Sequence, residues 1–437
     1  MNRYDNINLE SNRFAWNGDC MKNAICLLVA VFMAAACSKN KGATLPPPPL
    51  PVILPGDLCP APVPSVNTQV SQTSGEVNNP VIAPLDRGFY VAWRDWFGKY
   101  PTISGVKIDD AGLPVSEVNY FPNEGKCAAP AIAADADSTY ISWIDGASAR
   151  LVQLGKNNDK PLKFGETVKT AVAGPYGALV WEERGTLYFR NDGRLGLPDK
   201  NGNRPEPVPA VVATGGIESP ALAWTGEFYA IVWSASIAGG RNIMMQRITN
   251  DGRRLGPAVK ISGVGGHNNR PQIVWTGTEF AVAWTNAAPA EDNPEGNFRI
   301  FMAIVAKEGV RPLVTKQLEF NGSADVVSLA TTGAELAMAW VGTKKPAGSA
   351  VYFRRLDMKG NLVGEQIRVS DDQPVAVGRP DISYIKGGYG VVWHDSRDFA
   401  GAEVYFSFLA CSASEISTTA KDETDTAPDE SQLKEVF

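Results

Sequence analysis

Four carboxylates occupy the same position in different copies of a sequence repeat. If the fold brings them together, such carboxylates can bind a cation or act as acid and base. Seven tryptophans are spaced along the chain, at positions 93, 143, 181, 233, 284, 340 and 393. Two residues after the tryptophan, four of the seven copies carry an acid, namely Asp95, Asp145, Glu183 and Asp395. Acids on one rim could hold a cation, dock a basic partner or act as an acid–base pair on a glycosidic bond. Arginines adjoin three of the four, so we favour local ion pairs as the simpler interpretation.

Two further side chains near these acids are candidates for ligand contact. Trp96 breaks the tryptophan spacing and falls in a loop, where an exposed indole could stack on a ligand; packing within the loop is the alternative. His394 precedes Asp395, but no Ser or Cys nucleophile is positioned for a catalytic triad, so we expect a rim residue. No Asp-x-Asp-x-Asp-Gly calcium loop occurs. The sequence therefore assigns no catalytic residue, no metal site and no cofactor.

The composition narrows the class of protein. The 437 residues carry 41 Lys and Arg against 47 Asp and Glu, so the net charge of −6 provides no basic field for nucleic acid. With 42 Gly, 31 Pro and 9% aromatic residues, the chain favours a turn-rich β protein. The elements that position the candidate residues should therefore be strands.

The tryptophan copies predict how these strands repeat. They follow one another at intervals of 50, 38, 52, 51, 56 and 53 residues. Five of them carry a proline thirteen residues upstream, namely Pro80, Pro130, Pro220, Pro271 and Pro380. Turn signals such as Thr225-Gly226 and Asp251-Gly252 divide a copy into two hairpins, and hence four strands. Seven four-stranded units predict an all-β fold, a seven-bladed β-propeller over residues 65–411; a linear solenoid is the alternative.

The two ends of the repeat region predict how a ring would close. The last copy stops after its third strand, 403–409, and residues 65–71 match the pattern of a fourth strand, so an N-terminal strand would complete the last blade. Aligned on the repeat, Cys59 and Cys411 fall at adjacent positions of one hairpin turn. We therefore predict a disulfide between them, with two unrelated thiols as the alternative. Cys127 is left over and is expected to be a small buried residue.

The N-terminus has the pattern of an export signal. A basic residue precedes the apolar run 24–36, which is too short for a permanent membrane span. The run ends Met33-Ala-Ala-Ala-Cys37-Ser38, which resembles the lipobox of bacterial lipoproteins. The resemblance implies a lipid anchor on Cys37 and, from Ser38, placement in the outer membrane. An ordinary secretory signal cut near Ala36 is the alternative.

The composition around the repeats predicts a tether and a tail. Residues 38–64 are rich in proline, which is typical of an extended polyproline-like segment. The segment 412–437 carries seven acids and two lysines, which is typical of a disordered tail. The expected organisation is a leader and lipoprotein signal over 1–37, a tether over 38–64, the propeller over 65–411 and the tail over 412–437.

The last copy also carries a resemblance to a known family. Val391-Val-Trp-His-Asp-Ser-Arg397 resembles the Val-Val-Trp-x-Asp-x-Arg repeats of bacterial envelope and secreted β-propeller proteins, and weaker copies extend the resemblance across 65–411. That family shares an architecture rather than a reaction, so it implies no catalytic residue. We therefore expect a membrane-anchored binding or scaffold module that recognises an envelope protein or polysaccharide. A glycan hydrolase using rim carboxylates and a purely structural component are the alternatives.

Overall fold

The computed structural model describes residues 58–411 apart from 73–75, 97–99, 122, 124, 126, 128, 135–137, 147, 155–159, 162–166, 174–177, 192–209, 238–239, 264–265, 288–296, 310, 321–322, 345–347, 372–376 and 398–400. The chain divides into two compact units, Met1–Pro48 and Pro49–Phe437, and every described residue belongs to the second. The predicted leader with Cys37, the tether up to residue 57 and the tail 412–437 lie outside the described residues. Within those residues, no helix has the length and apolar character needed to cross a membrane.

Twenty-nine strands and no helix are found in the described part of the chain. In chain order they are β1 (Val63–Pro64), β2 (Thr68–Gln69), β3 (Val77–Pro84), β4 (Phe89–Asp95), β5 (Thr102–Ile108), β6 (Asn119–Phe121), β7 (Ala131–Ala134), β8 (Thr139–Asp145), β9 (Ser148–Gln153), β10 (Lys160–Pro161), β11 (Thr167–Ala173), β12 (Ala178–Glu183), β13 (Thr186–Arg190), β14 (Ala210–Thr214), β15 (Gly216–Trp224), β16 (Phe228–Ile237), β17 (Gly240–Thr249), β18 (Val259–Lys260), β19 (Gly266–Trp275), β20 (Glu279–Asn286), β21 (Arg299–Ala306), β22 (Pro312–Leu318), β23 (Ser323–Thr331), β24 (Leu336–Lys344), β25 (Gly348–Leu356), β26 (Leu362–Arg368), β27 (Asp381–Ile385), β28 (Gly388–Asp395) and β29 (Glu403–Ala410).

The strands form antiparallel meanders in which each strand pairs with the next one along the chain. Four sheets are single four-stranded meanders: β3–β6, β7–β10, β11–β14 and β23–β26. The eight-stranded sheet consists of two meanders, β15–β18 and β19–β22, joined by a short parallel pairing of β17 with β19. The last sheet contains β27, β28 and β29, and β1 and β2 both pair with β29.

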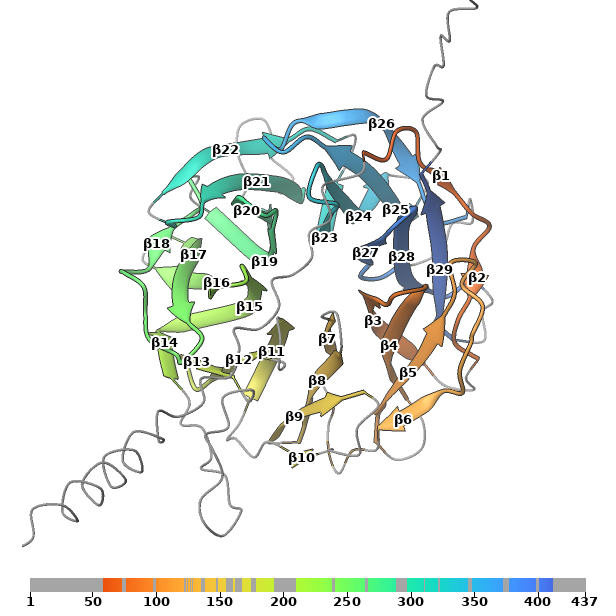
Figure 1. The fold of residues 1–437 in the computed structure, drawn as a ribbon, viewed down its shortest axis with the longest axis horizontal. Coiled ribbons are helices and arrows are strands. Elements are labelled where there is room, and N and C mark those ends of the chain that lie inside the picture. Colours follow the sequence, from red (N-terminus) through yellow and green to blue (C-terminus); the bar gives the residue numbers. More distant parts are fainter. Residues whose placement is uncertain are drawn as a thin grey trace, which may run out of the picture. The chain divides into compact units, whose positions relative to one another are not determined.

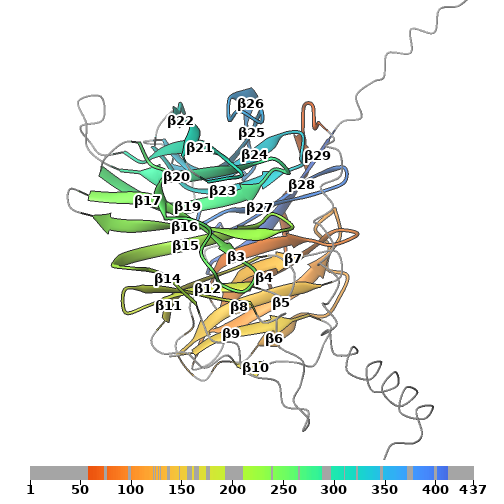
Figure 2. The same ribbon diagram turned by 60° about the vertical axis from the view of Figure 1, so that its left-hand side comes forward.

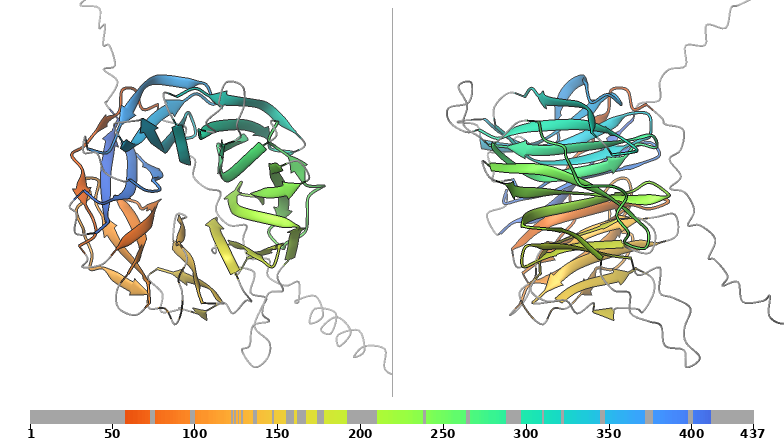
Figure 3. Two further views of the ribbon diagram at one scale, coloured as in Figure 1. Left: turned by 180° about the vertical axis from the view of Figure 1, so that it is seen from behind. Right: turned by 90° about the vertical axis from the view of Figure 1, so that its left-hand side faces the viewer.

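The meanders are arranged around a common centre. The first strand of each one lies nearest the centre in Figure 1, and the same order is seen from behind in Figure 3. Each of these first strands contacts the first strand of the next meander, and β27 of the last sheet contacts β3 of the first. From the side, successive sheets lie face to face (Figure 2). The fold is therefore all-β and β-propeller-like, as the sequence predicted.

A bulge in the first strand explains three of the five recurring prolines. In β3, β15 and β19 the pairing with the second strand skips two residues, and the second of these is the repeat proline. The residue before it has a positive φ, 52° at Asn79, 50° at Ser219 and 51° at Arg270. A bulge accepts proline because its missing amide hydrogen is not needed in the ladder there. The first strand β23 bulges at Val326 without a proline, which indicates that packing also holds the bulge in place.

The repeat tryptophans fill the space between sheets. Six of them are at most 1% exposed, and Trp233 is 3% exposed. Four stack on an aromatic residue of the third strand of their own sheet, in the pairs Trp181–Tyr188, Trp284–Phe301, Trp340–Tyr352 and Trp393–Tyr405. Burial of one such side chain contributes about 2 to 3 kcal/mol. The tryptophan spacing therefore marks the cores between neighbouring sheets rather than a ligand site.

The first and last sheets are joined through the N-terminal segment. Outside the short strands β1 and β2, the amides of Ser65 and Val70 donate to β29 carbonyls, each at 2.8 Å. Cys59 and Cys411 form the predicted disulfide, with their Cα atoms 4.7 Å apart. The expected N-terminal strand is thus confirmed as two short strands. Val63 and Pro64, which we assigned to the tether, belong to the sheet instead, because their backbone pairs with the end of β29.

Glu335 secures the same end of the segment from a neighbouring sheet. This carboxylate is buried, and its Oε1 accepts the Cys59 amide at 3.2 Å and the Tyr389 hydroxyl at 2.9 Å. Its Oε2 pairs with Arg355 at 2.6 Å, so the buried charge is compensated. The disulfide is therefore held in place by a polar network as well as by its own covalent bond.

The closure can be tested through the two cysteines. Cys59→Ser, Cys411→Ser and the double variant should each lower the free energy of unfolding by the same amount, about 5 kcal/mol, because any of them opens the same long loop. Denaturant unfolding monitored by tryptophan fluorescence measures this, with the reduced wild type as the control. Additive losses in the two single variants would show that the thiols act separately.

Candidate functional site

The acids that follow the repeat tryptophans are internal. Asp95, Asp145 and Asp395 are 1%, 6% and 1% exposed, and Glu183 is half-buried. A strand places residues i and i+2 on one face, so each acid shares the face of its tryptophan. The acidic rim predicted from the sequence is therefore wrong for three of its four carboxylates, which are not exposed to a partner or a substrate.

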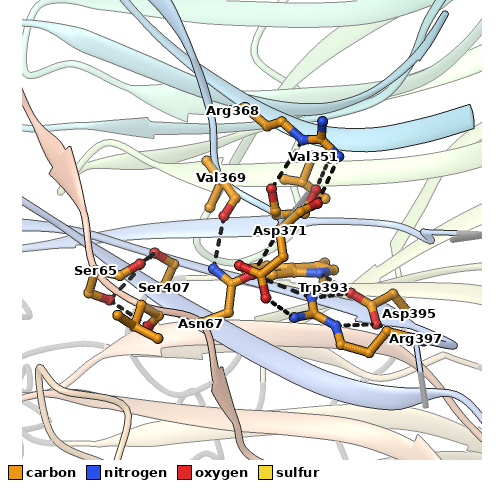
Figure 4. Close-up of polar contacts among 12 residues, drawn as sticks. Ser65, Asn67, Val351, Arg368, Val369, Asp371, Trp393, Asp395, Arg397 and Ser407 are labelled. Carbon is orange, nitrogen blue, oxygen red and sulfur yellow. Dashed lines mark hydrogen bonds and ion pairs between the residues drawn. The ribbon is translucent and has the colours of Figure 1, made fainter. Parts of the chain in front are cut away.

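Asp395 shows what these carboxylates do (Figure 4). Its Oδ2 accepts the indole N–H of Trp393 at 2.9 Å, and its Oδ1 accepts Nε of Arg397 at 2.8 Å. Nη2 of Arg397 lies 2.5 Å from Oδ2, which completes a two-pronged ion pair. Asp145 is likewise paired, with Arg150 at 2.7 Å. Of the ion pairs with adjacent arginines that we favoured from the sequence, the one at Asp395 is thus confirmed, whereas Asp145 pairs with an arginine of the next strand.

Two other buried groups are not accessible to solvent reagents. Burial raises the pKa of Asp95, and a hydrogen bond from Oγ of Ser104 at 3.2 Å opposes that shift. Burial also raises the pKa of Cys127 to about 12, so its thiol stays protonated at neutral pH. Cys127 is a small buried residue, as predicted, rather than a reactive nucleophile.

Arg397 also belongs to a latch that holds the N-terminal segment, made of Asn67, Asp371, Asp395 and Arg397 (Figure 4). Asn67 donates from Nδ2 to the Val369 carbonyl at 2.9 Å and accepts the Asp371 amide at 2.9 Å. Arg397 pairs with Asp371 as well as with Asp395. Asn67 and Asp371 carry no repeat signal, so the sequence analysis missed them.

Trp96 and His394 differ in accessibility. Trp96 is 48% exposed, and the Arg94 guanidinium lies 5.4 Å from its ring centroid, so the indole is accessible to solvent and contact with a ligand stays a prediction. His394 packs its ring against Gly378. Burial lowers the pKa of His394 to about 4, although the Asp395 charge opposes that shift. His394 is therefore part of the packing between strands rather than an open rim residue.

Side chains around the bulges of the first strands form a second polar group, which we call the inner ring: Glu218, Ser219, Asn269, Arg270, Asp325, Arg379 and Asp381. Oγ of Ser219 lies 3.4 Å from Oδ1 of Asn269 in the next sheet. In the same way, Nη1 of Arg270 lies 2.8 Å from Oδ2 of Asp325 in the sheet after that. In both contacts the first residue stands immediately before the repeat proline of its own sheet. Its partner stands two residues before the position equivalent to that proline in the next sheet. The sheets are therefore in register around the centre.

Asp381 joins three sheets within the inner ring. Its Oδ1 accepts Oγ of Ser328 at 2.6 Å and the Ile382 amide at 3.1 Å, and its Oδ2 accepts the Ile82 amide at 3.0 Å. Burial raises the pKa of Asp381, and these hydrogen bonds oppose the shift. Arg379, two residues earlier, is exposed and lies before the repeat proline Pro380. The sequence marked Pro380 but not the side chains on either side of it.

The described residues contain no group of three or more His, Cys, Asp or Glu side chains that could hold a metal ion. Three sets of polar groups are candidates for ligand contact: the internal ion pairs, the exposed pair of Arg94 and Trp96, and the inner ring. Of these, the last two are open to a ligand from solvent.

Comparison with known proteins supports the fold. No protein-family model matches the sequence, and no curated protein is significantly similar to it. Among solved structures, a protein of unknown function from Dyadobacter fermentans is 10% identical with a TM-score of 0.50, over 80% of this chain and 100% of that one. The phage phi92 endosialidase has a TM-score of 0.49 at 9% identity, over 81% of this chain and 70% of its own. The Trypanosoma rangeli sialidase has 0.43 at 10%, over 76% and 55%. At 10% identity the likeness to the Dyadobacter fermentans protein concerns the fold alone.

The structural role of Asp395 predicts a large loss of stability on its removal. Asp395→Ala should lower the free energy of unfolding by about 3 kcal/mol, because it leaves Trp393 and Arg397 without their buried acceptor. Asp371→Ala, at a side chain that is 49% exposed, should cost less than about 1 kcal/mol. Denaturant unfolding of both variants provides the comparison, and equal losses would contradict the assignment.

Because His394 is largely buried, we expect the free energy of unfolding to depend on pH. Its pKa of about 4 lies below the ordinary 6.5, so the unfolded chain binds this proton first as pH falls. Stability should therefore decrease between pH 6.5 and 4, by about 3 kcal/mol for this group. His394→Asn should remove that part of the slope in unfolding experiments, and His267→Asn, at an exposed histidine, is the control. An unchanged slope in His394→Asn would count against the burial of a neutral imidazole.

Proposed function

We propose that this protein is a seven-bladed β-propeller of the bacterial cell envelope, anchored to the outer membrane by lipid on Cys37, and that it binds an envelope protein or polysaccharide. Seven meanders of three or four strands, with β27 in contact with β3, support the propeller. The oxidised Cys59–Cys411 pair fits an extracytoplasmic location. The anchor is inferred from the lipobox-like residues before Cys37.

The observation that favours a binding function over a hydrolase is that three of the four acids after the repeat tryptophans are buried, and two of these are paired. Hydrolysis of a glycosidic bond needs two carboxyl groups that reach the substrate. Asp145 and Asp395 are buried and each is paired with an arginine, and Asp95 is buried as well. These groups stabilise the sheets and are not free to transfer protons to a ligand. The exposed Trp96 with Arg94 offers instead an aromatic surface of the kind that stacks on a sugar or a side chain.

A hydrolase is the second candidate, and one observation favours it. The raised pKa of Asp381 is a property that general acids need, and Asp325 lies in the neighbouring sheet as an ionised partner of Arg270. Asp381, however, accepts hydrogen bonds from Ser328, Ile82 and Ile382. Because both oxygens are engaged in joining sheets, hydrolysis remains the second candidate.

One experiment tests both parts of the proposal. Tagged wild type, Cys37→Ala and Trp96→Ala are expressed in the native type of host, fractionated and cross-linked in the cell. Wild type should be found in the membrane with a cross-linked envelope component. Cys37→Ala should be released from the membrane, whereas Cys26→Ala, within the predicted signal, should remain. Trp96→Ala should stay on the membrane and lose most of the cross-linked component.

The matched control for the binding part is Tyr120→Ala, which removes another exposed aromatic side chain. This variant should keep the component. Membrane retention of a signal-cleaved Cys37→Ala protein would contradict the anchor. Equal cross-linking by Trp96→Ala and wild type would contradict the assigned surface.

A further inference from the structure

Arg379 is the one inner-ring arginine without a partner. Its position before Pro380 is equivalent to that of Arg270, which pairs with Asp325 in the next sheet. In the part of the chain that the structure describes, Arg379 makes no hydrogen bond and no ion pair. Its side chain is exposed, so solvent and a dissolved ligand have access to it.

The acceptors that could satisfy Arg379 are already engaged. By the register of the inner ring, the equivalent partner in the first sheet is Asn78, whose Oδ1 accepts Nδ2 of Asn79 at 2.8 Å. Asp381 accepts three hydrogen bonds from other sheets and strands. Asp325 is held by Arg270. The last sheet therefore has a donor for which the described residues supply no acceptor.

The surroundings make this arginine different from one on an outer edge. Protein atoms crowd the guanidinium and lower the pKa of Arg379; the Asp381 charge opposes that shift, and the Arg270 charge adds to it. Because the side chain is exposed, its N–H groups are hydrated and have no acceptor among the described residues, so a ligand can replace that water. An oxyanion from solvent would supply two acceptors in the geometry that the planar guanidinium matches.

A second unsatisfied polar group belongs to the same sheet. The ring of His394 packs on Gly378, the residue immediately before Arg379 in the sequence. Nδ1 of His394 is buried and has no hydrogen-bond partner among the described residues. The last sheet thus has unused hydrogen-bonding capacity on β28 as well as at Arg379.

We propose that Arg379 is a binding site for an oxyanion, a carboxylate, sulfate or phosphate group of the ligand, with Arg270 adding positive charge. The inference deepens the proposed binding function by giving the ligand's charged group. It depends on the inner ring alone, and so does not require the lipid anchor or the surface at Trp96.

Thermal unfolding of the purified full-length chain tests the site. Acetate, sulfate and inorganic phosphate are titrated separately at an ionic strength held constant with chloride. A ligand that binds only the folded state raises the melting temperature in a saturable way. At least one of the three should do so with wild type. Arg379→Gln should weaken that binding about 10- to 100-fold, the loss expected for charge-assisted hydrogen bonds.

Control variants separate this site from general charge effects. Arg253→Gln removes an exposed arginine of an outer hairpin and should leave the titration unchanged. Arg379→Lys keeps the charge but loses the planar pair of donors, so it should bind more weakly than wild type. A response to acetate alone identifies a carboxylate ligand, and a response to sulfate or phosphate identifies a tetrahedral one.

Two results would overturn the proposal. One is the absence of a saturable response to all three anions, or an equal response in Arg379→Gln. The other is a fall in the melting temperature of Arg379→Gln without any anion, since that would make Arg379 a structural residue. Membrane release or loss of cross-linking in the experiment on Cys37 and Trp96 leaves this result untouched, so the two proposals fail separately.

Discussion

Each sheet of this protein is apolar on both faces, and only a neighbouring sheet can cover them. The tryptophans of the second strands are buried in these spaces. The first and last sheets obey the same requirement, because Val392, Val404 and Phe406 share a core cluster with Phe89 and Val91. The first and last sheets must therefore meet. The N-terminal pairing with β29, the Cys59–Cys411 disulfide and the Glu335 network all stabilise that meeting.

The same requirement explains why so many charged groups are internal. At the end of the second strand of a sheet, the side chains still pack against the neighbouring sheet. A carboxylate at that position is therefore removed from water. Asp395 and Asp145 are matched by arginines of their own sheets, which compensates the buried charge. Arg397 extends this pairing to Asp371 and Asn67, and so connects the packing of the last sheet to the N-terminal segment. These interactions of Arg397 therefore hold the N-terminal segment against the last sheet.

The inner ring is freer to vary, because its side chains project from bulges whose backbone is held by strand pairing on either side. Equivalent positions carry Ser219, Arg270 and Val326, and only some of them find partners in the next sheet. Equivalent positions of the repeat thus carry residues of different chemistry, and such differences give a repeated fold one distinctive site. In this protein the distinctive residue is Arg379, whose neighbours are engaged elsewhere.

The sequence by itself determined the strand repeat, the recurring prolines and the partnership of Cys59 with Cys411, because a period aligns equivalent positions without knowledge of their surroundings. It also suggested ion pairs for the rim acids, since Arg397 stands close in sequence to Asp395. Only the tertiary structure decided that Asp95, Asp145 and Asp395 are buried, that Asn67 reaches Val369, and that Arg379 has no acceptor among the described residues. The burial and the hydrogen bonding of a side chain depend on which side chains from other repeats pack against it. A local sequence pattern does not contain that information.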